Sequence, residues 1–152
     1  MAHTRPHLLI VSDDPDLASF LSEGLMLAGF WTSVVASALQ TLEVCRLRGF
    51  DLLLVDAGLA GLGPAELIHR LRARALEAGR ARVGCDVPMM VVAGDAAGVP
   101  PALVAAADGV LRPPLDIEDL APRLLAAVTA WRSDHPDRPW ADTAAQRSPS
   151  PS

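Results

Sequence analysis

The sequence predicts an α/β fold, in which a mostly parallel five-stranded sheet carries helices on both faces. Two observations predict it. Short, continuously apolar runs alternate with longer segments whose apolar residues recur at helical spacing, which is the pattern of repeated strand–helix units. Glycine, proline and helix-capping residues separate these segments, as expected where elements begin and end.

The expected strands are short and rich in aliphatic residues. They cover residues 7–12, 31–36, 51–55, 88–92 and 109–111. The first and third strands are apolar without alternation, which is typical of strands buried on both faces of a parallel sheet. The third strand should therefore be central.

The expected helices begin at capping residues or prolines, and several end at glycine. They cover residues 15–28, 38–48, 65–78, 102–107 and 115–131. Ser37 is the expected cap of the second helix, and Gly29 ends the first. Pro122 lies near the start of the last helix, where a proline conflicts with a helix interior.

The 152 residues predict one domain with two flanking segments. Residues 1–6 are expected to be a flexible N-terminus, residues 7–131 the domain, and residues 132–152 a disordered tail rich in proline and serine. The net charge of −5 disfavours direct binding to nucleic acid or to an anionic membrane surface.

Composition also bears on the compartment. No apolar run approaches the roughly 18–20 residues of a membrane span, and the N-terminus lacks the apolar core of a signal peptide. Two cysteines without a metal-type or redox-type spacing suit free thiols in a reducing compartment. A cytoplasmic protein is therefore expected.

Three carboxylates follow two of the expected strands. Asp13 and Asp14 come directly after the first strand, and Asp56 closes the third. In a strand order of 2-1-3-4-5 these strands are neighbours, and ligands of such sheets bind outside the carboxyl ends of the strands. The carboxylates would then converge, repel one another unless a cation neutralises them, and suit Mg²⁺ as hard oxygen ligands.

Such a pocket has a chemistry of its own, because a carboxylate can act as a nucleophile that forms an acyl phosphate. Other interpretations remain open at this stage. Asp13 and Asp14 could only cap the following helix, and Asp56 could be an acidic loop residue. A dinucleotide site is disfavoured because the turn after the first strand is acidic and lacks glycine.

With these residues in place, the chain resembles the receiver domain of bacterial two-component response regulators over about residues 7–130. The resemblance rests on four segments in order: Asp13-Asp14, residues 51–56 with Leu59 and Gly61 following, residues 87–92, and residues 106–111 before a proline pair. It implies a flavodoxin-like fold without enzymatic activity. It also implies that Asp56 is the phosphoacceptor and that Asp13, Asp14, Asp56 and the backbone carbonyl of Gly58 hold Mg²⁺.

The chain departs from the family at the positions that sense phosphorylation. Ala93 stands where the family has Thr or Ser, Val110 where it has an aromatic ring, and Pro113 where it has lysine; the chain contains no lysine at all. Arg112 precedes that position by one residue. It could replace the lysine only if the strand end shifts by one, and such a shift turns a side chain to the other face.

The resulting hypothesis is a stand-alone receiver that takes phosphate from a histidine kinase or phosphotransfer protein and switches in a degenerate way. The alternative is a phosphorylation-independent module that binds a downstream protein. A homodimer would use the face formed by residues 102–107, 109–111 and 115–131. An enzyme or nucleotide-binding protein on the same fold is a third hypothesis, which bound flavin or nucleotide would favour.

Overall fold

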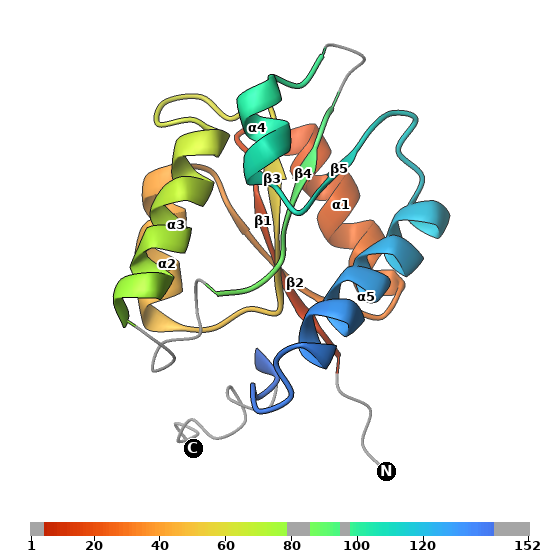
Figure 1. Cartoon of the computed structure of the whole chain (residues 1–152). Helices are drawn as coiled ribbons and strands as arrows, with labels where there is room; N and C mark the ends of the chain where they lie inside the picture. The colour runs from red at the N-terminus through yellow and green to blue at the C-terminus, as the bar shows by residue number, and fades with distance from the viewer. Residues whose placement is uncertain (1–4, 79–85, 95–97, 142–152) are drawn as a thin grey trace, which may run out of the picture.

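Five parallel strands form the sheet, in the order β2-β1-β3-β4-β5 (Figure 1). The structure is a computed structural model and describes residues 5–78, 86–94 and 98–141. The strands are β1 His7–Val11, β2 Trp31–Val35, β3 Leu52–Asp56, β4 Met89–Val92 and β5 Gly109–Leu111. The predicted fold class and strand order are both confirmed.

Helices connect the strands in strict alternation. They are α1 Pro15–Leu27, α2 Ala38–Leu47, α3 Pro64–Ala78, α4 Pro101–Ala106 and α5 Ile117–Ser133. Ser37 caps α2 as expected, because its hydroxyl accepts a hydrogen bond from the backbone N–H of Gln40 at 3.1 Å. None of the helices in the described ranges has the length and apolarity that a membrane span requires.

The last helix begins two residues later than the sequence suggests. Asp116 has an extended backbone and is the N-cap, and its carboxylate accepts from the N–H of Glu118 at 3.0 Å. Pro122 lies inside α5. Because the side-chain cap fixes the first turn, the helix starts at Ile117 and continues through the proline.

The sheet separates two apolar layers. Helices α1 and α5 cover one face and α2, α3 and α4 the other (Figure 1). Along β1 the side chains alternate, so that Leu8 and Ile10 pack with α1 and α5 while Leu9 and Val11 pack with α2 and α3. This two-sided burial explains why the central strands read as continuous apolar runs.

Residues 134–141 differ from the expectation of a disordered tail that begins at residue 132. They follow α5 and fold back on the end of the sheet where β1 and β3 begin. The backbone N–H of Ala141 donates to Asp51 Oδ1 at 3.0 Å, in a buried position. Asp51 Oδ2 accepts from the N–H of His7 at 2.8 Å, so one buried carboxylate joins the segment to β1.

Two arginines hold the same segment. Arg138 forms an ion pair with Asp86 at 2.7 Å, and the guanidinium of Arg132 lies 3.7 Å from the centre of the Trp140 ring. Burial lowers the pKa of Arg132, and the negative charge of Asp51 opposes that effect. Composition suggested disorder because residues 132–152 are rich in proline and serine, but these specific contacts order residues 134–141. Residues 142–152 of the expected tail lie outside the described residues.

Asp51→Ala should destabilise the protein by about 2–4 kcal/mol, because two buried backbone N–H groups lose their acceptor. Urea denaturation followed by circular dichroism measures the loss. Asp137→Ala also removes one carboxylate, but from an exposed position in residues 134–141. It should change stability by less than about 0.5 kcal/mol. Equal midpoints for the two variants would contradict the role of Asp51.

Candidate functional site

A pocket of about 450 Å³ lies at the carboxyl ends of the central strands. Its lining residues are Asp13, Asp14, Leu17, Asp56, Ala57, Gly58, Ala93, Gly94, Gly98, Val99 and Pro100. The pairing of β1 with β3, in which Val11 is opposite Val55, brings the two acidic segments together. All three carboxylates singled out from the sequence therefore lie at one pocket.

Asp56 is the most enclosed of these acids. It is the last residue of β3 and only 7% exposed. The hydroxyl of Ser12 donates to its Oδ2 at 2.7 Å, and the backbone N–H of Gly58 donates to its Oδ1 at 2.8 Å. Hydrogen bonds to an ionised carboxylate are among the stronger ones in proteins. Both oxygens of Asp56 are thus hydrogen-bonded, one to the residue that follows β1 and one to the loop that follows β3.

Asp14 is occupied at the start of α1. Its backbone is extended, and its Oδ1 accepts from the N–H groups of Asp16 at 3.0 Å and Leu17 at 3.3 Å. These bonds satisfy two of the free N–H groups of the first helical turn. The capping interpretation that the sequence left open therefore describes the contacts of Asp14.

Asp13 joins the loops after β1 and β3. Its exposed carboxylate accepts from the N–H of Ala60 at 3.1 Å through Oδ2. The loop that offers this N–H turns at Gly61 and Gly63, whose φ angles of +78° and +88° favour glycine. The glycine-rich turn thus folds the Asp56 loop toward Asp13.

Some of the oxygen atoms that line the pocket suit a hard cation such as Mg²⁺. Asp13, Asp56 and Gly58 line the same pocket, and Mg²⁺ in proteins is often held by one or two carboxylates with water completing its shell. Within the described residues, no three His, Cys, Asp or Glu side chains cluster as a metal site. The residues fit an ion bound through two carboxylates, with Asp14 engaged elsewhere.

The remaining pocket wall, as far as the described residues form it, carries no positive charge to receive a phosphate. Ala93 is buried at the end of β4 and presents a methyl group, which donates no hydrogen bond. No described residue of the lining is positively charged. Residues 95–97 of the neighbouring loop lie outside the described residues.

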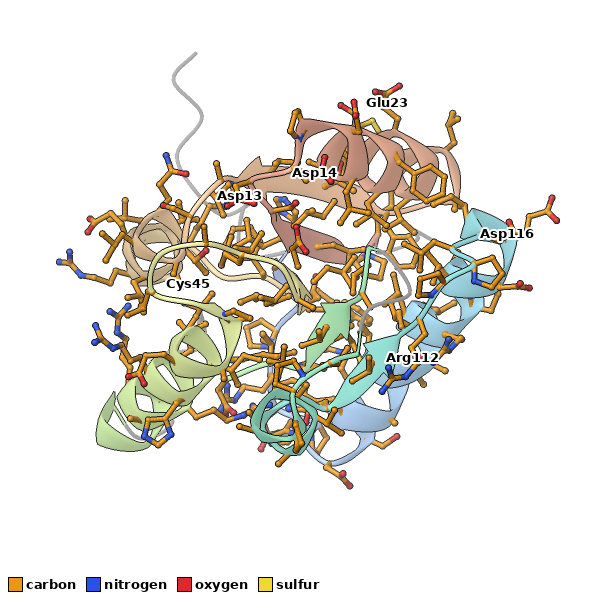
Figure 2. The ribbon with its side chains drawn as sticks, turned by 90° about the horizontal axis from the view of Figure 1, so that it is seen from above. Asp13, Asp14, Glu23, Cys45, Arg112 and Asp116 are labelled. Carbon is orange, nitrogen blue, oxygen red and sulfur yellow. The ribbon has the colours of Figure 1, made fainter. Side chains whose placement is uncertain are left out.

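Arg112 does not supply the missing cation. It is exposed, is absent from the pocket lining and, within the described residues, makes no hydrogen bond or ion pair with the three acids. Figure 2 shows it beside β5, well away from Asp13 and Asp14. The neighbouring position, Pro113, is joined to Pro114 by a cis peptide bond.

Val110 occupies the middle of β5. It is half-buried and packs against the apolar layer that includes α3 and α4. An aliphatic side chain there fills space between β5 and that layer. It has no aromatic ring or hydroxyl that could exchange hydrogen-bond partners.

Known proteins with similar sequences and structures identify the family of this chain. No family model matches the sequence. The chain is 30% identical over 124 residues to the DNA-binding response regulator MtrA of Mycolicibacterium smegmatis, across 82% of this chain and 51% of that protein. The chain thus spans about half the length of the curated relatives that it matches.

Solved structures of receiver domains identify the family of the chain. The CheY-like response regulator receiver domain from Methylobacillus flagellatus is 25% identical with a TM-score of 0.68, over 82% of this chain and 99% of that one. The chain belongs to the response-regulator receiver domains. A putative response regulator from Chloroflexus aurantiacus agrees, at 26% identity and a TM-score of 0.71, over 83% of this chain and 99% of the other.

Sequence reasoning overlooked one residue of this receiver domain, Ser12. Its hydroxyl contacts Asp56 directly, whereas neither Asp13 nor Asp14 does so by a hydrogen bond in the described structure. A signal was present, because Ser12 is the polar residue between the last apolar residue of β1 and the acidic pair. The pairing register of β1 with β3 was needed to place it beside Asp56.

Asp14→Ala should cost about 1 kcal/mol of stability, because the first turn of α1 loses its side-chain cap. Asp14→Ser should restore most of that loss, since serine is also a good N-cap. Asp13→Ala is the matched control and should change stability by less than about 0.5 kcal/mol. Urea denaturation distinguishes the three, and a larger loss for Asp13→Ala than for Asp14→Ala would contradict these roles.

Proposed function

We propose that this receiver domain accepts a phosphoryl group at Asp56 from a histidine kinase or phosphotransfer protein. The observation that carries the proposal is the setting of Asp56: a carboxylate at the end of a central strand, enclosed, hydrogen-bonded on both oxygens and facing an acid-lined pocket. The domain is then a phosphoryl acceptor, and not an enzyme that turns over a substrate.

In this reaction one oxygen of Asp56 attacks the phosphorus of the donor. An O–P bond forms while the P–N bond of a phosphohistidine breaks, and the electron pair leaves with the imidazole nitrogen, which takes up a proton. Acetyl phosphate replaces this donor in a test, with acetate as the leaving group. The chain contributes a fixed nucleophile, which removes part of the entropic cost of alignment.

The pocket needs a cation from outside for this step. A phosphoryl group brings negative charge to a site that contains Asp13 and Asp56 and has no positive charge among its described lining residues. Bound Mg²⁺ would offset that charge on the phosphoryl oxygens. Asp13 and Asp56 would hold it, with the carbonyl of Gly58 as a further candidate, while Asp14 keeps its place as the helix cap.

A second candidate function is a phosphorylation-independent module that binds another protein. Ala93, Val110 and the exposed position of Arg112 favour it, because none of them offers a contact that differs between the free and phosphorylated states. A ligand shifts a conformational equilibrium only through such differential contacts. We propose that phosphorylation, where it occurs, produces a weak or degenerate switch.

Partner contacts are proposed for the face formed by α4, β5 and α5. Val104 on α4 and Leu125 on α5 are large apolar side chains exposed by 43% and 47%. Exposed apolar residues on adjoining elements are a common feature of protein contact surfaces. The face would serve a downstream protein or a second copy of the domain.

Wild-type protein treated with acetyl phosphate and Mg²⁺ should gain the mass of one phosphoryl group. Asp56→Asn should abolish the gain, because an amide is not a nucleophile here, and EDTA should abolish it by removing the cation. Intact-mass spectrometry measures the product, and hydroxylamine should release it as expected for an acyl phosphate.

Asp137→Asn is the matched control for this experiment, since it removes an exposed carboxylate distant in the sequence from the pocket. It should react like the wild type. A wild-type protein that stays unmodified, or an Asp56→Asn variant that gains the same mass, would reject the phosphoacceptor role and leave the phosphorylation-independent function as the better one.

A further inference from the structure

We infer that Ser12 is a positioning residue that holds the Asp56 carboxylate in the orientation from which it receives a phosphoryl group. The inference rests on the proposed function and adds to it a residue on β1's carboxyl end. It follows from the burial of Ser12, from the direction of its hydroxyl proton and from its place beside the acceptor.

The main chain and the side chain of Ser12 are both fixed. Its N–H donates to the carbonyl of Val35 at 3.0 Å and extends the pairing of β1 with β2 by one residue. Its side chain is only 3% exposed, and its Oγ lies 2.7 Å from Asp56 Oδ2. A rigid strand end therefore presents one hydroxyl to the acceptor.

The direction of that hydrogen bond can be assigned. The N–H of Asp14 donates to Ser12 Oγ at 3.1 Å, which uses a lone pair of the hydroxyl oxygen. Its single proton then has two acceptors within reach, Asp56 Oδ2 at 2.7 Å and the carbonyl of Asp14 at 3.4 Å. The shorter bond to a charged acceptor is the stronger one, so Ser12 donates to Asp56.

Ser12 restricts a rotation that the rest of the site leaves free. The terminal torsion of an aspartate is broad and has no sharp minimum. The N–H of Gly58 holds Oδ1 alone, and Ser12 is the only side chain in the described part of the chain that donates to Asp56. Two donors on different oxygens fix the plane of the carboxylate, which is what an aligned attack requires.

The neutral hydroxyl also determines the charge next to the acceptor. A carboxylate at position 12 would lie within contact of Asp56 Oδ2, given the present separation of 2.7 Å. Two carboxylates at such a distance are stable together only if one is protonated or a cation lies between them. Ser12 thus keeps the β1 side of Asp56 free of a second negative charge.

The test compares Ser12→Ala with Ser12→Thr in the whole chain. Phosphorylation by acetyl phosphate at saturating Mg²⁺ is followed by intact mass. Ser12→Ala should react about 10-fold more slowly, as expected for the loss of a hydrogen bond to a charged group. Ser12→Thr keeps the hydroxyl and should retain most of the rate. Ser19→Ala, at an exposed serine of α1, is the matched control and should leave the rate unchanged.

A third variant gives a readout that does not depend on phosphoryl transfer. Ser12→Asp should bind Mn²⁺, titrated by electron paramagnetic resonance, at least about 10-fold more tightly than the wild type, because a second carboxylate then lies against Asp56. Unchanged affinity in this variant would overturn the placement of Ser12 beside the acceptor.

The outcomes separate the inference from the proposed function. A Ser12→Ala variant that reacts at the wild-type rate or faster, or a Ser12→Thr variant as slow as Ser12→Ala, overturns the positioning role while Asp56 remains the acceptor. A wild-type protein that is not modified at Asp56 overturns the proposed function, and the positioning role for Ser12 falls with it.

Discussion

The parallel pairing of β1 with β3 is the constraint on which the site depends. Its register sets Val11 opposite Val55, so the next residues of the two strands, Ser12 and Asp56, meet at the carboxyl ends. Burial of both strands on both faces fixes this register, because a shift by one residue would turn every apolar side chain to the other layer. The core of the sheet thus determines the contact between Ser12 Oγ and Asp56 Oδ2.

Negative charge is the second organising feature. The pocket gathers Asp13, Asp14 and Asp56, and each is accommodated in a different way: Asp14 by the first turn of α1, Asp13 by the N–H of Ala60, and Asp56 by Ser12 and Gly58. Neutral donors suffice for the free site. They would not suffice for an added phosphoryl group, which explains why the proposed reaction requires an external cation.

Much of this arrangement could be predicted from the sequence. The strand runs, the cap at Ser37 and the three acids at strand ends are local patterns, and local patterns specify elements and their order well. The distinct roles of Asp13 and Asp14 could not be separated, because a cap and a metal ligand are the same residue type at the same place. Ser12 was overlooked since its significance comes from a partner 44 residues away.

Residues 134–141, which follow α5, also depend on contacts with distant residues that the sequence does not predict. The prolines and serines of residues 132–152 are typical of disorder, yet Asp51 and Asp86 lie where Ala141 and Arg138 can reach them. Such contacts join residues far apart in the chain, and no sequence periodicity predicts them. Composition indicates whether a segment can form a core of its own, and it does not indicate whether a segment has partners on a core already formed.

The most direct test of the central claim is a crystal structure of the domain with Mg²⁺ and beryllofluoride, a mimic of a bound phosphoryl group. Beryllium should bond to an oxygen of Asp56, the metal should contact Asp13 and Asp56, and Asp14 should still accept from the N–H groups of Asp16 and Leu17. Beryllofluoride bound at another residue, or Asp14 released from α1 to bind the metal in place of Asp13, would contradict the account.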